Sequence, residues 1–150
     1  PGAPAAARPA GPRVLIVDDE VPVRSALARY FTRRGWQVEQ AADGRAALAR
    51  VDARLAEAAD EGPDEPPFAL ILSDLRMPGL SGMVFHDEVA RRAPALLGRL
   101  VFSTGDVVSE DAAAFVARTA CPVLEKPYDL ATLEALVQRV LAGAAGAVSV

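Results

Sequence analysis

The sequence has only one cysteine and one histidine, and it has no long apolar run. With Cys121 alone, an internal disulfide and a cysteine-built metal site are both excluded, and with His86 alone no pair of histidines can share a metal ion. No apolar stretch approaches the length of a transmembrane helix, and no signal peptide opens the chain. These absences favour a cytoplasmic protein whose domain makes no contact with a membrane.

The chain also lacks the excess of basic residues that marks a nucleic-acid surface, since its net charge is −4. Neither G-x-G-x-x-G nor a P-loop follows the first predicted strand, which disfavours nucleotide binding. We therefore expect no direct contact with nucleic acid. What the 150 residues do contain is 51% hydrophobic side chains, enough for one domain with a full core.

Composition divides the chain into three parts. Residues 1–12, P-G-A-P-A-A-A-R-P-A-G-P, are rich in proline, alanine and glycine and predict an extended linker. Residues 13–142 alternate apolar runs with amphipathic segments and predict the folded domain, and residues 143–150 predict a frayed tail. The first residue is Pro1 rather than Met, which indicates a piece of a longer protein or a processed chain.

Five apolar or alternating runs predict strands, and a segment with helical spacing follows each of them. The strands are expected at about 14–17, 36–40, 68–72, 99–102 and 123–124. The helices are expected at about 22–34, 43–59, 81–93, 109–118 and 129–142. This alternation predicts an α/β fold, a single doubly wound (βα)5 domain with a five-stranded parallel sheet and helices on both faces. The acidic, proline-rich segment 60–67 predicts an exposed loop.

Polar residues stand where four of these strands end. Asp18 and Asp19 follow the first strand, Asp74 the third, Thr104 the fourth and Lys126 the fifth. Because the carboxyl ends of parallel strands share one rim of the sheet, we expect these side chains to lie together. Three carboxylates placed together repel one another, raise their pKa values and usually hold a cation, and oxygen ligands favour Mg²⁺. A lysine and a hydroxyl beside them suit phosphoryl oxygens, so the rim predicts a phosphate-handling pocket with a carboxylate as candidate nucleophile.

Four motifs carry these residues: V-L-I-V-D-D-E, I-L-S-D-L-R-M-P-G, V-F-S-T-G and L-E-K-P-Y. In this order and at this spacing, they resemble the receiver domain of two-component response regulators. The resemblance covers about residues 13–142 and implies a flavodoxin-like sheet with strand order 2-1-3-4-5. It also implies that the Lys126–Pro127 peptide bond is cis, as only a bond before proline readily is.

The resemblance implies a role for each residue at the rim. Asp74 would accept a phosphoryl group, Asp19 would bind Mg²⁺ directly and Asp18 largely through water. The main-chain carbonyl of Arg76 would be a further ligand of the ion. Thr104 and Lys126 would bind the phosphoryl oxygens.

The resemblance also implies partners. A histidine kinase or a histidine phosphotransfer domain would donate the phosphoryl group from a phosphohistidine, and the domain itself would carry out self-phosphorylation and autodephosphorylation. The wording S-D-L-R-M-P-G with V-L-E-K-P-Y is similar to bacterial receivers at the C-terminus of hybrid sensor histidine kinases. A stand-alone single-domain regulator is the alternative.

Two other classes of function are weighed against this one. A phosphohydrolase that uses an aspartyl-phosphate would need an acid two residues after the nucleophile, where Arg76 stands. A pseudo-receiver that only binds partners would have lost a key residue, and all five are present. The chain departs from many receivers at Val123, where they carry an aromatic switch residue. Arg76 and Asp106 follow adjacent strands and can pair over the pocket mouth, or they stay two solvated charges.

Overall fold

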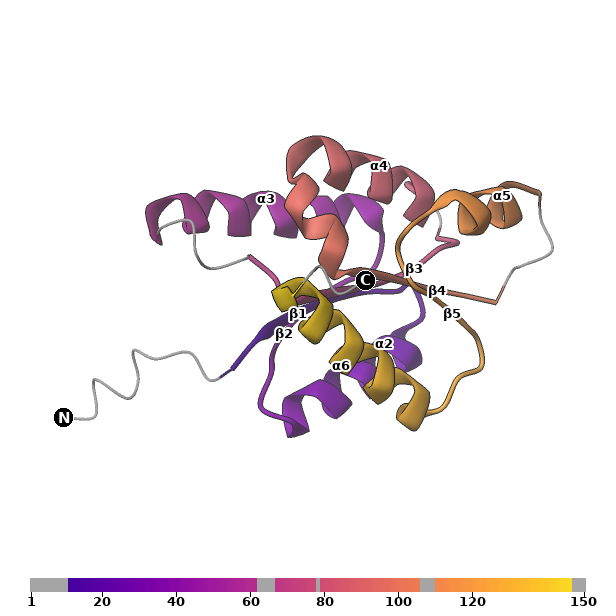
Figure 1. Cartoon of the computed structure of the whole chain (residues 1–150), viewed down its shortest axis with the longest axis horizontal. Coiled ribbons are helices and arrows are strands. Elements are labelled where there is room, and N and C mark those ends of the chain that lie inside the picture. The colour runs from indigo at the N-terminus through magenta and orange to yellow at the C-terminus, as the bar shows by residue number, and fades with distance from the viewer. Residues whose placement is uncertain (1–10, 62–66, 78, 106–109, 147–150) are drawn as a thin grey trace.

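Five parallel strands form one sheet in the order β2-β1-β3-β4-β5. Figure 1 shows the sheet between two layers of helices. The computed structural model describes residues 11–61, 67–77, 79–105 and 110–146. The strands are β1 (Arg13–Val17), β2 (Gln37–Ala41), β3 (Leu70–Asp74), β4 (Leu100–Thr104) and β5 (Val123–Glu125). The helices are α2 (Val21–Arg33), α3 (Gly44–Glu61), α4 (Gly82–Arg92), α5 (Glu110–Arg118), α6 (Leu130–Gly146) and the 3-10 helix η1 (Pro94–Arg99). The predicted fold class and strand order are confirmed.

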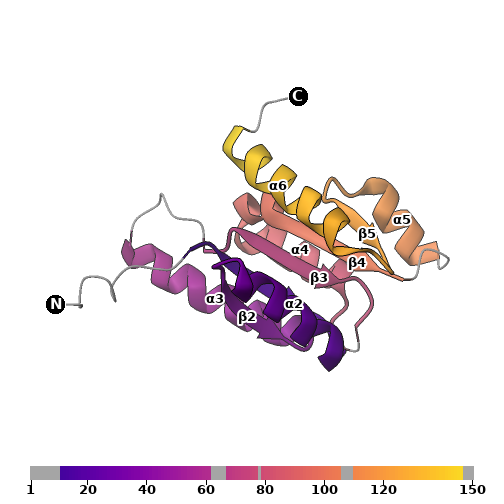
Figure 2. The ribbon, with the colours of Figure 1, turned by 90° about the horizontal axis from the view of Figure 1, so that it is seen from below.

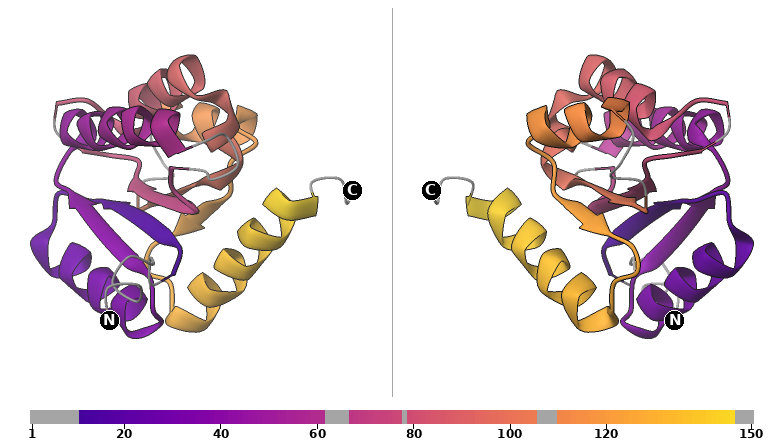
Figure 3. Two further views of the ribbon diagram at one scale, coloured as in Figure 1. Left: turned by 90° about the vertical axis from the view of Figure 1, so that its left-hand side faces the viewer. Right: turned by 90° about the vertical axis from the view of Figure 1, so that its right-hand side faces the viewer.

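Helices cover both faces of the sheet, as expected (Figure 3). Figure 2 looks onto the face that α2 and α6 cover, where Phe31 and Val137 join one apolar cluster with Ile16 of β1. On the other face α3, α4 and α5 contribute to a second cluster, which includes Val51 and Phe85. Strands β3 and β4 are buried along their whole length, and only the first residue of β1 is not. Burial on both faces explains why these strands are continuous apolar runs.

The register of the strands brings their carboxyl ends level with one another. Val17 of β1 pairs with Ser73 of β3, so the residues that follow Val17 lie beside Asp74. Asp74 in turn pairs with Ser103 of β4, one residue before Thr104. All of the strand ends that the sequence singled out therefore meet at the same rim of the sheet.

Some element boundaries differ from the prediction. The predicted linker 1–12 is partly ordered, because Gln37 donates its main-chain N–H to the Pro12 carbonyl at 2.8 Å and its side-chain amide to the Gly11 carbonyl at 3.0 Å. Helix α6 continues to Gly146 instead of ending at 142. Gly143 does not end it because two alanines follow, and alanine is the best helix former.

Other predicted segments are covered only in part. Helix α3 extends to Glu61, two residues beyond the expected end, and η1 was not predicted. Residues 62–66 of the acidic loop, the first ten residues and residues 147–150 lie outside the described part of the chain. Within the described part, no helix has the length and apolar character to cross a membrane.

Candidate functional site

Three carboxylates meet at the carboxyl rim of the sheet. Asp18 and Asp19 lie in the turn after β1, and Asp74 is the last residue of β3. One oxygen from each lies within 4.8 Å of the other two. Asp18 is 2% exposed and Asp74 is 7% exposed, whereas Asp19 is open to solvent. The structure thus brings together the three acids that the sequence singled out.

Lys126 reaches the same cluster from the end of β5. Its Nζ lies 3.2 Å from Oδ2 of Asp18 and 3.4 Å from Oδ2 of Asp74. Its main-chain N–H donates to the Thr104 carbonyl at 2.8 Å, which joins the ends of β4 and β5. The bond from Lys126 to Pro127 is cis, as expected. The Lys126 ammonium therefore pairs with two of the three carboxylates, and these four side chains together carry an excess of negative charge.

The electrostatics of the pocket follow from this imbalance. Burial raises the pKa of Asp74 above its ordinary value, against a lowering by Lys126 and with a further rise from Asp18. For Lys126, burial opposes the charged form, but the carboxylates of Asp74 and Asp18 prevail and raise the pKa of the ammonium. The Asp74 carboxylate is thus incompletely compensated by the groups around it, which is the condition that a bound cation relieves.

The first residues of α4 pack and hydrogen-bond against the end of β3. The Ser81 hydroxyl caps the helix by accepting from the Val84 N–H at 3.3 Å, and the Gly82 N–H donates to the Leu75 carbonyl at 3.0 Å. A Cβ at Gly82 would lie 2.5 Å from the Asp74 carbonyl oxygen and 2.8 Å from the Leu75 Cα. Only glycine permits this approach, so Gly82 lets α4 begin directly against the residue that carries the central carboxylate.

The remaining predicted residues are placed as follows. Thr104 ends β4 and is fully buried, on the strand beside Asp74. The side chain of Arg76 is exposed, and its main-chain N–H donates a hydrogen bond to the Asp74 carboxylate. Asp106 lies outside the described residues, so its pairing with Arg76 stays a prediction.

The sequence analysis missed two residues near the pocket. Arg24 of α2 donates from NH1 to the main-chain oxygen of Asp18 at 2.7 Å. Burial raises the pKa of the half-buried Tyr128, Lys126 lowers it, and the carboxylates of Asp18 and Asp74 add to the rise. Tyr128 is the last residue of the L-E-K-P-Y motif, so the sequence held a signal for it. For Arg24 the only signal in the sequence was its position near the start of the helix that follows the rim.

A sequence profile described as the response regulator receiver domain matches residues 14–138. The chain belongs to this family. The response regulator MprA of Mycolicibacterium vanbaalenii is 36% identical to this receiver over 132 residues, which cover 86% of the chain and 50% of MprA. The transcriptional activator protein PfeR of Pseudomonas aeruginosa is 31% identical over 130 residues, covering 87% of the chain and 38% of PfeR. The receiver thus spans half or less of the length of these curated relatives.

Solved structures of receiver proteins are similar to this chain. The chemotaxis protein CheY4 of Vibrio cholerae is 31% identical with a TM-score of 0.66, over 87% of this chain and 98% of that one. A CheY-like response regulator receiver domain protein from Methanospirillum hungatei JF-1 gives a TM-score of 0.73 at 20% identity, over 91% of this chain and 98% of the other. At that lower identity the likeness shows the fold alone, a CheY-like flavodoxin fold.

The acid cluster fits the ion that such a pocket holds. Receiver domains generally bind Mg²⁺ at an acidic pocket, and here three carboxylates lie within reach of one ion. Hard oxygen donors suit Mg²⁺, which binds through a few carboxylates and keeps some of its water. Asp19 is exposed, so solvent reaches the cluster on that side.

Proposed function

We propose that this receiver accepts a phosphoryl group on Asp74, from a phosphohistidine of a histidine kinase or a histidine phosphotransfer domain, in a transfer that depends on Mg²⁺. The observation that supports this most directly is the meeting of three carboxylates and Lys126 at one rim, in a chain of the receiver family. Phosphorylation of a buried carboxylate at the junction of β3 and α4 would then change the surfaces that partners meet.

Each residue has a distinct part in the proposed transfer. An oxygen of Asp74 attacks phosphorus, and the new O–P bond forms as the N–P bond to the imidazole breaks. The imidazole nitrogen keeps the electron pair of the broken bond and takes up a proton from water. Lys126, whose Nζ lies 3.4 Å from Oδ2 of Asp74, offers a charged donor to the transferred group, and Thr104 offers a hydroxyl from the next strand.

The metal ion belongs to the same proposal. We assign Asp18, Asp19 and Asp74 as its side-chain ligands and the Arg76 main-chain carbonyl as a further one. When bound there, Mg²⁺ would neutralise charge on the phosphoryl oxygens. The protein's own contribution is to hold the carboxylates close enough that their repulsion is relieved by a divalent cation.

Acetyl phosphate and intact mass measurement test the proposal. With Mg²⁺ the parent protein should gain the mass of one phosphoryl group, and in EDTA it should gain none. Asp74→Asn should gain none under either condition. Asp129→Asn is the matched control, because Asp129 is an exposed acid after β5 that caps α6 at the Thr132 N–H, 2.8 Å away, and it is not in the acid cluster. Uptake by Asp74→Asn in Mg²⁺ would contradict the assignment.

The setting of the domain is also a proposal. The chain spans half or less of the two curated relatives named above, so it fits a receiver within a longer protein. The proposed division stays linker 1–12, receiver 13–142 and tail 143–150, although Gly11 and Pro12 bond to Gln37 and helix α6 runs into the tail as far as Gly146. The proposed place of the receiver is the C-terminus of a hybrid histidine kinase in the cytoplasm, with a stand-alone regulator as the alternative. Phosphoryl transfer from a phosphorylated histidine kinase domain or histidine phosphotransfer domain would identify the donor.

A further inference from the structure

Asp18 and Asp19 are neighbours in the sequence but are held very differently. The Asp18 N–H donates to the Ala41 carbonyl at 3.1 Å, and its Oδ1 accepts from the Glu20 N–H at 2.9 Å. Its Oδ2 accepts from Lys126 at 3.2 Å. Asp19 is exposed, and within the described part of the chain no hydrogen bond or ion pair holds its carboxylate. Some other contact must therefore keep Asp19 aimed at the cluster.

A side chain does contact the peptide unit that links Asp18 to Asp19. The carbonyl oxygen of Asp18 accepts a hydrogen bond from NH1 of Arg24 at 2.7 Å. The Asp18 carbonyl and the Asp19 N–H belong to one planar peptide unit, so fixing the carbonyl fixes the plane from which the Asp19 side chain departs. Arg24 is itself anchored, because its main-chain N–H donates to the Glu20 carbonyl at 3.0 Å at the start of α2.

We propose that Arg24 is a positioning residue for the divalent-cation site: through the Asp18 carbonyl it holds the Asp19 carboxylate at the cluster with Asp74. This inference rests on the magnesium site of the proposed function and adds the residue that orders it. Arg24 would act through the peptide plane and would contact neither the ion nor the phosphoryl group. Groups that orient metal ligands in this way typically change metal affinity by about 10-fold to 100-fold when they are removed.

The sign of the effect separates positioning from simple electrostatics. A guanidinium near a cation site repels the ion, so its loss through charge alone would tighten Mg²⁺ binding. If Arg24 instead positions Asp19, its loss weakens Mg²⁺ binding, because the peptide unit before the Asp19 side chain is no longer held in one orientation. The two explanations therefore predict opposite directions for the same substitution.

Isothermal titration of the full chain with Mg²⁺ at constant ionic strength tests this. Arg24→Met removes the donor and the charge but keeps an unbranched side chain, and it should raise the Mg²⁺ dissociation constant about 10-fold or more. Arg24→Lys keeps the charge and a donor and should recover part of the affinity. Arg29→Met is the matched control, because Arg29 lies on the same helix with an exposed side chain. It should bind Mg²⁺ as the parent does.

Melting curves in EDTA, followed by circular dichroism, establish that each variant is folded at the titration temperature. Weaker binding by folded Arg24→Met with partial recovery by Arg24→Lys supports the proposal. Unchanged or tighter binding by Arg24→Met overturns it. If Arg24→Met does not fold, Arg24→Gln replaces it with the same expected direction. A parent protein that binds no Mg²⁺ would instead overturn the proposed function, so the two failures are distinguishable.

Discussion

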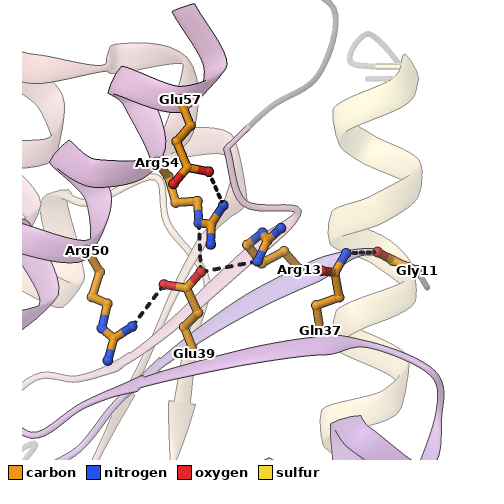
Figure 4. A network of polar contacts seen from close by, with 7 residues as sticks. All are labelled: Gly11, Arg13, Gln37, Glu39, Arg50, Arg54 and Glu57. Carbon is orange, nitrogen blue, oxygen red and sulfur yellow. Dashed lines mark hydrogen bonds and ion pairs between the residues drawn. The ribbon is translucent and has the colours of Figure 1, made fainter. Parts of the chain in front are cut away.

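Two charged clusters in this molecule have opposite imbalances. At the rim, three carboxylates lie together, and the ammonium of Lys126 pairs with two of them, Asp18 and Asp74. In the arginine network, defined as Glu39 of β2 with Arg13, Arg50 and Arg54, one carboxylate is shared by three guanidinium groups (Figure 4). The distances from Glu39 are 3.2 Å to Arg13, 3.4 Å to Arg50 and 2.7 Å to Arg54.

The two clusters differ in where the excess charge lies. The guanidinium side chains of the arginine network are 25%, 50% and 26% exposed, so water solvates the surplus positive charge. Glu57 takes up part of it by pairing with Arg54 at 2.6 Å (Figure 4). At the rim the surplus lies partly on Asp18 and Asp74, whose side chains are 3% and 10% exposed. Unpaired charge that water solvates costs little free energy, whereas unpaired charge that is buried requires a counter-ion. The rim therefore indicates a bound cation, and the arginine network indicates no ligand.

The substitution with the largest expected effect disturbs the rim without changing any charge. Gly82→Ala places a methyl group against the Asp74 and Leu75 backbone, where the space is too small. The free energy of unfolding in urea should fall by about 2–3 kcal/mol, because the start of α4 is forced away from β3. Acetyl phosphate labelling should weaken with it.

Gly98→Ala is the control for that substitution. A Cβ at Gly98 would meet nothing within 4 Å, so this variant should unfold at nearly the parent's urea concentration. Equal losses of stability in the two variants would show that the close approach at Gly82 has no special part in holding the rim.

The next effect concerns the arginine network. Glu39→Gln removes the carboxylate that three guanidinium groups share, and we expect the free energy of unfolding to fall by about 1–2 kcal/mol. Mg²⁺ binding, measured by titration, should be unchanged, because no residue of the arginine network belongs to the acid cluster at the rim. A loss of Mg²⁺ affinity in Glu39→Gln would show that the two clusters are coupled.

The smallest effect compares two acids with opposite pKa shifts. The pKa of Asp74 is raised, so its carboxyl group favours folding in the protonated form, and that contribution is lost as pH rises from the ordinary carboxyl pKa through the raised one. In EDTA at neutral pH, Asp74→Asn should therefore have a slightly higher Tm than the parent. The difference should vanish in acid, below the ordinary carboxyl pKa.

Asp129→Asn should behave in the opposite way. A hydrogen bond from the Thr132 main-chain N–H lowers the pKa of Asp129, so its ionised form favours folding above the ordinary carboxyl pKa and this contribution is lost as pH falls through the lowered one. The neutral-pH Tm of Asp129→Asn should be slightly lower than that of the parent. Melts of both variants over the acid range would show whether the two differences have opposite signs.

Local pattern and topology together predicted most of this fold and the residues at the rim. Each central strand is an apolar run whose end is marked by a change to polar residues, and Asp18, Asp74 and Thr104 stand at those changes. Once parallel strands are inferred, their carboxyl ends must share an edge. The meeting of the acids with Lys126 therefore required no knowledge of side-chain packing.

The parts that escaped prediction depend on contacts between distant segments. Glu39 lies in the alternating run 36–40, and that pattern does not indicate its partners, which come from β1 and α3, 26, 11 and 15 residues away in the sequence. The bond from Arg24 to the Asp18 carbonyl depends on the path of the turn between β1 and α2, which periodicity does not reveal. The end predicted for the last helix, at about residue 142, was wrong, because the alanines after Gly143 favour helix and α6 continues to Gly146.

The most direct test of the account locates the phosphoryl group on the chain. After treatment with acetyl phosphate and Mg²⁺, borohydride reduction converts an aspartyl phosphate to homoserine, and fragmentation mass spectrometry then identifies the altered residue. We predict homoserine at Asp74 and at neither Asp18 nor Asp19. Homoserine at Asp18 or Asp19, or labelling that does not depend on Mg²⁺, would contradict the claim that the excess of buried acid at the rim forms a metal-dependent phosphoacceptor site.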